Sequence, residues 1–235
     1  MKSIDEMRIS YNEFIERQRK GYEITAAMIG YIVQKMQEAS IVKGEVSISG
    51  RIKSFKSAYE NTGKKAVDDC FGIRIVGNIN DLIAIERELN RILVLDLKKD
   101  HRKNKNTKYN GLHEMVHMDS RYIKEYGMQE DETEQIFFPQ IEVQYWSEET
   151  RQECVYGELA YAKYKRKDLL AIKARLETNR EDAYKDLPIC YEIQGNNIRR
   201  LSHIETLYKV YPEIQELEEK REKASVVPDA DDGDR

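Results

Sequence analysis

Four groups of polar side chains in this sequence have the types needed to bind phosphates and to activate a hydroxyl group. They are Arg51 with Lys53 and Ser57, Asp69 with Arg74, Tyr109 with His113, and Glu142 with Gln144. Guanidinium and ammonium groups neutralise phosphate oxygens, so the first group is suited to a chain of phosphates. Taken alone, the same group is more typical of a solvated strand face.

Two acidic residues stand where phosphoryl chemistry would use them. Asp69 comes just before an expected strand, and a carboxylate there can hold Mg2+ together with phosphate oxygens. Glu142 projects from another expected strand, as a general base for a hydroxyl or as a second acidic group near the metal. The alternatives are a turn or capping role for Asp69 and a cross-strand ion pair for Glu142.

The histidines and cysteines do not form a recognisable metal motif. The three cysteines, at positions 70, 154 and 190, are widely scattered and have no paired spacing. His113 and His117 are four residues apart, which suits a shared metal on a helix, whereas this stretch alternates like a strand. There is also no glycine-rich phosphate loop in the sequence. Any phosphate site must therefore be assembled from several elements.

The bulk composition is that of a globular protein. The chain has 235 residues, of which 40% are hydrophobic and 35% charged, and a net charge of −4. One substantial core is expected at this length. No apolar run approaches the roughly 20 residues of a membrane helix, and the first residues lack the pattern of a signal peptide. We expect a cytoplasmic protein without membrane association.

Apolar periodicity indicates how the polar groups are positioned. Helical spacing over residues 4–40 predicts two helices broken near Gly21. Residues 44–53 alternate, so that Ile48 and Ile52 share one face of a strand while Arg51 and Lys53 share the other. This strand would carry a cationic face.

Further strands and helices follow at intervals typical of an α+β protein. Strands are predicted over 68–77, 92–97, 112–118, 137–146 and 187–195. Helices are predicted over 54–61, from a cap at Asn80 to Asn90, from 148 to about 180, and over 202–223. In the last of these helices Pro212 would form a kink or restart the helix. We therefore predict an α+β fold with a mixed sheet of about five strands flanked by helices. The expected organisation is N-terminal helices (1–43), a core (44–180), a C-terminal strand and helices (181–222) and a disordered acidic tail (223–235).

Taken in order, the polar groups resemble the synthetase domain of the RelA/SpoT family, which makes (p)ppGpp alarmones. GRIKSFKSAYEN is similar to the ATP-side motif of that family, DDCFGIRIVG to its Asp-x-x-Gly-x-Arg strand, NKNTKYNGLHEM to its acceptor loop and IEVQYW to its Glu-x-Gln strand; GELAYAKYKR resembles the helix that follows. These matches span about 44–166 in the family's order. No His is followed by Asp, as the family's hydrolase domain requires. The resemblance therefore implies a stand-alone small synthetase with a nucleotidyltransferase-like fold.

The resemblance also implies a role for each polar group. Arg51, Lys53, Ser57 and Arg74 would bind ATP, Asp69 and Glu142 would be the catalytic and Mg2+-binding residues, and Lys105, Lys108, Tyr109, His113 and Gln144 would bind the acceptor. Tyr109 would stack on guanine, and Glu142 would activate the 3′-hydroxyl. The implied reaction transfers the β,γ-pyrophosphate of ATP to GDP or GTP.

The sequence departs from the family pattern around the acceptor. Lys108 and Gly111 stand where the family has Gly and Ser, Trp146 stands where it has Arg, and a Lys expected near Asn61 is missing. The acceptor therefore stays open at this point.

Two other functions remain possible interpretations of the same residues. Toxic small synthetases that resemble this family pyrophosphorylate the 3′ CCA end of tRNA, and the acceptor loop is rich in basic residues that would suit an RNA backbone: Lys98, Lys99, Arg102, Lys103, Lys105 and Lys108. A catalytically degenerate nucleotide sensor is the other interpretation. The departures at Lys108 and Trp146 favour it, and the retention of both Asp69 and Glu142 opposes it.

The amphipathic helices expected at either end leave the assembly state open. They would either pack on each other or serve a partner chain, such as an antitoxin protein or a second copy in a homo-oligomer.

Overall fold

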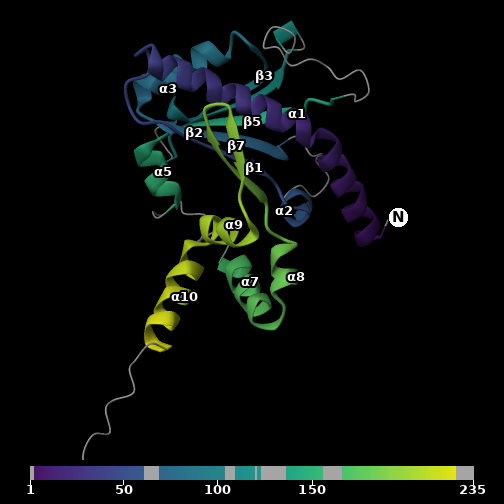
Figure 1. Ribbon diagram of the computed structural model, residues 1–235. Coiled ribbons are helices and arrows are strands. Elements are labelled where there is room, and N and C mark those ends of the chain that lie inside the picture. Colours follow the sequence, from purple (N-terminus) through teal and green to yellow (C-terminus); the bar gives the residue numbers. More distant parts are fainter. Residues whose placement is uncertain are drawn as a thin grey trace, which may run out of the picture.

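A seven-stranded mixed sheet with helices on both faces forms the framework of the computed structural model (Figure 1). The structure describes residues 3–60, 69–103, 109–119, 121–122, 136–155 and 166–225. The strands are β1 (Ser47–Ile52), β2 (Phe71–Gly77), β3 (Leu93–Asp100), β4 (Gly111–Met118), β5 (Ile141–Ser147), β6 (Ile189–Gln194) and β7 (Asn197–Arg200). The order is β3-β4-β5-β2-β1-β6-β7, with β2 and β5 parallel and the other neighbours antiparallel. The α+β prediction is confirmed.

The helices of the described residues lie before, between and after these strands. They are α1 (Ile4–Glu38), α2 (Phe55–Glu60), α3 (Ile79–Leu89), α5 (Glu148–Val155), α7 (Arg166–Thr178), α8 (Arg180–Tyr184), α9 (His203–Val210) and α10 (Pro212–Ser225), with a short 3-10 turn, η1 (His101–Lys103). None of them contains a stretch that is both long and apolar enough to cross a bilayer. The tail predicted to be disordered lies outside the described residues from position 226 onward.

The predicted count of about five strands is wrong, because the sheet has seven. The clearest addition is β7, which pairs with β6 as an edge hairpin. Its sequence, NIRR, is too short and too polar to show an alternating pattern. Gly195 makes the connecting turn at a φ of +55°, a conformation that glycine adopts without the steric cost of a side chain.

The predicted break near Gly21 is also wrong, because α1 runs without interruption from Ile4 to Glu38. Gly21 allows a close approach instead. A Cβ at this position would lie 2.2 Å from the carbonyl oxygen of Phe137. The start of α1 is stabilised by a capping box between Ser3 and Glu6.

Two further helix boundaries were set by local signals. Asn78, and not the predicted Asn80, caps α3, since its side chain accepts a hydrogen bond from the backbone N–H of Asp81. Pro212 restarts the chain as the first residue of α10, as one of the two predicted alternatives has it.

One face of the sheet carries the main core and the other carries polar side chains. Helices α1 and α3 cover the apolar face, which includes the fully buried Ile75, Leu112 and Val143 (Figure 1). A second, smaller apolar cluster joins α7, α9 and α10 around Leu207. Because side chains alternate across a strand, the residues between these core positions point to the opposite, polar face.

Candidate active site

The pairing register places the predicted site residues side by side on the polar face. Arg74 of β2 and His113 of β4 lie directly opposite Gln144 of β5, one on each side of it. In the adjacent row, Arg51 of β1 lies opposite Gly72, which lies opposite Glu142. Strands that are distant in sequence therefore contribute to one surface, on which neighbouring strands are about 5 Å apart.

One series of hydrogen bonds leads from Arg74 to Glu142. The guanidinium group donates to Oε1 of Gln144 from Nε at 3.2 Å and from Nη2 at 3.0 Å. Gln144 in turn donates from Nε2 to Oε2 of Glu142 at 2.7 Å. The Gln144 amide therefore links the Arg74 guanidinium to the Glu142 carboxylate and restrains one relative to the other.

A second series reaches the other oxygen of Glu142 from Trp146. The indole Nε1–H donates to the Tyr109 hydroxyl at 2.7 Å, and that hydroxyl is hydrogen-bonded to Nε2 of His113. Nδ1 of His113 lies 2.9 Å from Oε1 of Glu142. The two series meet at both ends, because the guanidinium carbon of Arg74 lies 3.5 Å from the centroid of a Trp146 ring.

We call this closed set the site ring. Its members are Arg74, Gln144, Glu142, His113, Tyr109 and Trp146.

The donors in the site ring can be assigned from chemistry. A carboxylate only accepts, so His113 donates from Nδ1 to Glu142. Burial raises the pKa of Tyr109 well above its usual value, so its hydroxyl stays protonated. Both side chains that contact the carboxylate of Glu142 therefore donate to it.

Glu142 is held as a carboxylate by these contacts. Burial of the group raises its pKa, but the hydrogen bond and charge of His113, the hydrogen bond from Gln144 and the charge of Arg51 outweigh burial and lower the pKa to about 2. Its side chain is 16% exposed, so the group remains accessible. Glu142 is thus suited to accepting a hydrogen bond from a substrate hydroxyl at neutral pH.

The guanidinium group of Arg74 is largely removed from solvent, which is unusual for a cation. Burial and, next, repulsion from Arg51 lower its pKa to about 10, which still leaves it charged at neutral pH. The Trp146 indole supplies a cation–π contact on one side of it, a favourable partner for a guanidinium that has lost water. The two cations together make this part of the face attractive to phosphates.

Lys53 and Asp69 form a second polar unit beside the end of β1. The ammonium of Lys53 bonds Oδ2 of Asp69, whose side chain is 45% exposed. Ser57 follows on α2, and its backbone N–H donates a hydrogen bond to the Ser54 hydroxyl oxygen. On the predicted ATP side, Arg51 thus lies on β1, Arg74 on β2 and Ser57 on α2, with Lys53 just after β1. Among the described residues of the predicted acceptor side, His113 lies on β4, Gln144 on β5 and Tyr109 just before β4.

Gly72 leaves an opening in the row between Arg51 and Glu142. A Cβ at this position would meet only backbone oxygens, those of Arg51 and Glu142, each at 3.8 Å. The glycine is therefore not required by packing within the sheet. It leaves strand backbone without a side chain between the Arg51 cation and the Glu142 carboxylate.

The aromatic side of the site includes a residue that sequence reasoning missed. The ring of Tyr109 lies edge-on to His101, to His113 and to Trp146, with centroid distances of 5.3, 5.5 and 6.0 Å. His101 precedes the basic loop by sequence but returns to the site through η1. Trp146 was recognised only as a departure from the family pattern, although it belongs to the site ring.

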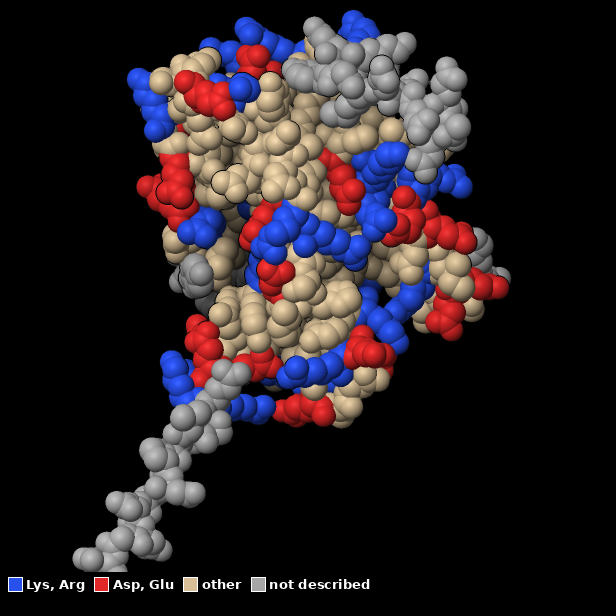
Figure 2. Space-filling model, in the orientation of Figure 1, with Lys and Arg blue, Asp and Glu red and all other residues tan. Residues whose placement is uncertain are grey.

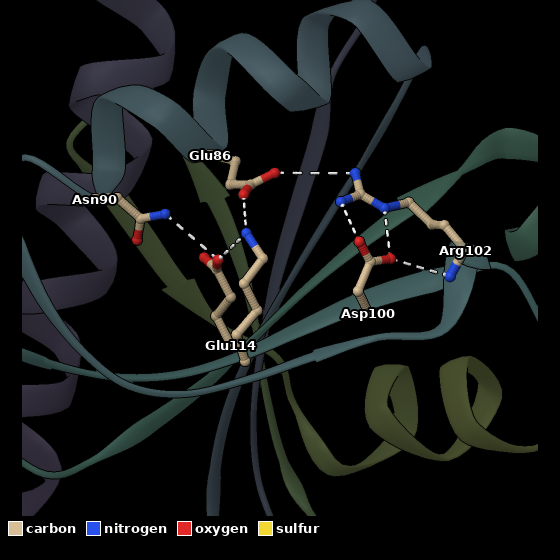
Figure 3. A network of polar contacts seen from close by, with 6 residues as sticks. Glu86, Asn90, Asp100, Arg102 and Glu114 are labelled. Atoms are coloured by element: carbon tan, nitrogen blue, oxygen red, sulfur yellow. Dashed lines mark hydrogen bonds and ion pairs between the residues drawn. The ribbon is translucent and has the colours of Figure 1, made fainter. Parts of the chain in front are cut away.

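Two of the basic residues assigned to an RNA surface have carboxylate partners on or beside the core face. Lys98 bonds Glu86 and lies 3.1 Å from the fully buried Glu114. Arg102 pairs with Asp100, with 2.9 Å between Nε and Oδ1; Figure 3 shows these two side chains pointing toward each other. Lys99, by contrast, lies opposite His113 and so points to the site face. Lys105, Lys108, Asn61 and the side chain of Lys103 lie outside the described residues.

The surface charges on the face drawn in Figure 2 are mixed in sign. Basic and acidic side chains alternate over it, without a continuous basic area. Arg199 of β7 bonds both Glu192 and Glu205.

The donor chemistry of the site is compatible with Mg2+. Within the described residues, no group of three or more His, Cys, Asp or Glu side chains could hold a metal by itself. Mg2+ commonly needs only one or two carboxylates, since phosphates and water complete its coordination. Asp69 offers a carboxylate that is 45% exposed and contacts Lys53, and each oxygen of Glu142 retains a second lone pair. His117 pairs with Asp96, so it does not join His113 in a metal site.

Comparisons with known proteins find similar solved structures. No protein-family model and no curated protein sequence matches the chain. The chain is similar to small alarmone synthetase 1 from Bacillus subtilis bound to its product pppGpp, with 14% identity, a TM-score of 0.47, and coverage of 92% of this chain and 98% of that one. A GTP pyrophosphokinase family protein from Streptococcus pneumoniae matches with 14% identity, a TM-score of 0.46, and coverage of 92% and 97%. The Bacillus subtilis enzyme bound to AMPCPP matches with 16% identity, a TM-score of 0.48, and coverage of 74% and 90%.

Proposed function

We propose that this protein is a pyrophosphokinase that transfers the β,γ-pyrophosphate of ATP to the 3′-hydroxyl of GDP or GTP. The observation that carries the proposal is the position of Glu142 at the meeting point of the site ring, between phosphate-directed cations on one side and an aromatic acceptor side on the other. The motif order in the sequence supports the same reaction.

The donor half of the site would bind ATP through its cations. Arg51 and Arg74 project from neighbouring strands, and Lys53 lies at the end of the strand that carries Arg51. A triphosphate would bring these positive charges together and relieve the mutual repulsion that acts on Arg74. Positioning and charge neutralisation of this kind supply most of the rate in phosphoryl transfer.

The acceptor half would place the guanine nucleotide against Tyr109 and its hydroxyl against Glu142. Tyr109 is fixed at its hydroxyl by Trp146 and His113, which leaves the aromatic ring as the contact for a base. Gln144 and His113 then fix both oxygens of Glu142. An acceptor hydroxyl would donate to one of the remaining lone pairs of this carboxylate.

The proposed step conserves atoms and charge as follows. The 3′-oxygen of the acceptor forms a bond to the β-phosphorus of ATP, and the bond from that phosphorus to the α,β-bridging oxygen breaks. AMP leaves with the bridging oxygen, and the hydroxyl proton passes to Glu142 and then to solvent. Because the pKa of Glu142 is about 2, this group orients the hydroxyl and receives the proton only as the new P–O bond forms.

Asp69, with Glu142, would hold Mg2+ against the donor phosphates. When bound, the ion would neutralise charge that develops on the phosphate oxygens. Lys53 contacts Asp69 directly, so this lysine would orient the carboxylate as well as bind phosphate.

The test is product formation from labelled ATP with three acceptors offered in parallel. Purified protein is incubated with γ-labelled ATP and Mg2+, together with GDP, GTP or deacylated tRNA. We expect label on the guanine nucleotide and one AMP released per product. Glu142→Gln should abolish both signals, whereas Glu192→Gln, an exposed glutamate on β6, should leave them unchanged.

Two results would overturn the proposed acceptor. Label on tRNA alone would identify a modifier of the tRNA 3′ end. Nucleotide binding without transfer to any acceptor would identify a sensor. Activity retained in Glu142→Gln would overturn the assigned role of this residue.

A further inference from the structure

The site ring contains one member that no donor or acceptor role accounts for. Trp146 is buried, being 6% exposed, so its indole is not free to form a broad stacking platform for substrate. It nevertheless makes two contacts with residues of opposite halves of the site. Its Nε1–H holds the Tyr109 hydroxyl, and one of its rings lies against the guanidinium of Arg74.

We propose that Trp146 is a positioning residue that couples the donor half of the site to the acceptor half, so that binding of one nucleotide strengthens binding of the other. This inference rests on the proposed function, because it takes ATP and a guanine nucleotide as the two ligands.

The geometry gives the coupling two routes. Through Trp146, the Arg74 side chain and the Tyr109 hydroxyl share one rigid indole. Along the other route, Arg74 reaches Tyr109 through Gln144, Glu142 and His113. A closed set of contacts restrains each member from two sides, so immobilising one member immobilises the rest.

The sign of the coupling follows from conformational entropy. Phosphates that bind Arg74 further restrict the motion that the Trp146 and Tyr109 side chains retain in the unliganded ring. Binding of a guanine nucleotide to Tyr109 then causes a smaller loss of conformational entropy. The result is positive cooperativity without a change of shape. Linkage requires the same factor when the order of binding is reversed.

Substitution at Trp146 separates its two contacts. Trp146→Phe keeps an aromatic face beneath Arg74 but removes the only N–H that the indole offers. The cation–π contact should survive in weaker form, while the link to Tyr109 is lost. Tyr109→Phe breaks the same link from the other side and leaves the indole in place.

The first measurement needs no ligand, because the chain contains a single tryptophan. Its indole N–H therefore gives one assignable signal in a 15N–1H NMR spectrum. We expect this signal to shift in Tyr109→Phe and in Arg74→Lys. It should stay in place in Tyr122→Phe, which removes a hydroxyl that bonds the Arg91 carbonyl instead. An unchanged indole signal in Tyr109→Phe would overturn the proposed contact.

The second measurement determines dissociation constants by calorimetry. Binding of a non-hydrolysable ATP analogue is measured with and without saturating GDP, and binding of GDP with and without the analogue. In the wild type we expect each ligand to bind at least about fivefold more tightly when the other is present, with equal factors in both directions. In Trp146→Phe each ligand should still bind alone, but the factor should fall to about one. If that variant does not fold, Tyr109→Phe should show the same loss.

The outcomes distinguish the coupling from the proposed function. Binding of both nucleotides by the wild type without coupling, or coupling that survives in Trp146→Phe and Tyr109→Phe, would overturn the role of Trp146 alone. A wild-type protein that binds neither nucleotide would overturn the proposed function, and coupling between those ligands with it.

Discussion

His113 donates to Glu142 across two neighbouring strands, with 2.9 Å between Nδ1 and Oε1. Because this contact and the one from Gln144 engage both carboxylate oxygens, Glu142 has a fixed orientation before any substrate arrives. A fixed carboxylate costs little reorganisation when a hydroxyl binds it, which is how preorganised polar groups lower a reaction barrier.

Removing the charge of Glu142 should therefore reduce turnover more than binding. For Glu142→Gln we expect kcat to fall by about 100-fold or more, the scale of a positioned acid–base group, while the KM for ATP changes little. Initial rates of AMP release at varied ATP test this. A variant with near wild-type kcat would remove Glu142 from the chemistry.

The low pKa of Glu142 predicts an acid-sensitive contribution to stability. Its folded-state pKa is about 2 against an ordinary value of 4.5, so the contribution is present above about pH 4.5 and is lost as the pH falls through 2. The difference corresponds to about 3 kcal/mol. Urea unfolding at pH 6, 4 and 3 should show a smaller loss in Glu142→Gln than in the wild type. Equal losses would show that His113 and Gln144 do not stabilise the carboxylate.

Two glycines on neighbouring strands should respond differently to a methyl group. At Gly50 a Cβ would lie 2.3 Å from the hydroxyl of the fully buried Tyr22, so Gly50→Ala should destabilise the protein by about 2 kcal/mol. At Gly72 the strand accommodates a methyl group, so stability should be unchanged or slightly higher. In the proposed reaction that methyl group would stand in the way of substrate beside Glu142. We expect kcat/KM of Gly72→Ala to fall about tenfold, equivalent to about 1.4 kcal/mol.

Thermal unfolding and steady-state rates are measured on both glycine variants, so that each variant serves as the control for the other. Loss of stability in Gly72→Ala, or full activity in it, would contradict the open row between Arg51 and Glu142.

Adjacent lysines on β3 should have separate effects, because they point to opposite faces. Lys98→Met leaves the buried Glu114 without its nearest cation and should lower the free energy of unfolding by about 2 kcal/mol. Lys99→Met should leave stability unchanged but weaken acceptor binding, since Lys99 lies beside His113 on the site face. Chemical denaturation and the acceptor KM distinguish the two. A Lys98→Met protein as stable as the wild type would contradict the role of Lys98 in stabilising the buried Glu114.

Alternation along the strands made the site face predictable from sequence. The pattern around Ile48 and Ile52 already placed Arg51 on a polar face, and the pattern around Val143 did the same for Glu142. Which strands become neighbours was not predictable from alternation, because it depends on the pairing of distant segments. The role of Trp146 was hidden for the same reason: its partners Tyr109 and Arg74 are 37 and 72 residues away.

Tertiary contacts also explain the incorrect helix break. A glycine in a helix usually weakens it, and Gly21 was interpreted in that way. In the structure its missing side chain admits the backbone at Phe137, a segment more than a hundred residues later. No local signal distinguishes a glycine that ends a helix from one that admits a neighbouring backbone.

The late arrival of β6 has a consequence for synthesis on the ribosome. Strand β1 has β2 on one side and β6 on the other, yet β6 begins only at Ile189. Until that segment has emerged, a growing chain exposes one edge of β1 with its unpaired backbone groups. Open strand edges are templates for pairing with another chain. On a polysome, unfinished copies would therefore be able to pair through this edge, and we expect slower release of residues 189–194 from the ribosome to increase aggregation of the growing chains.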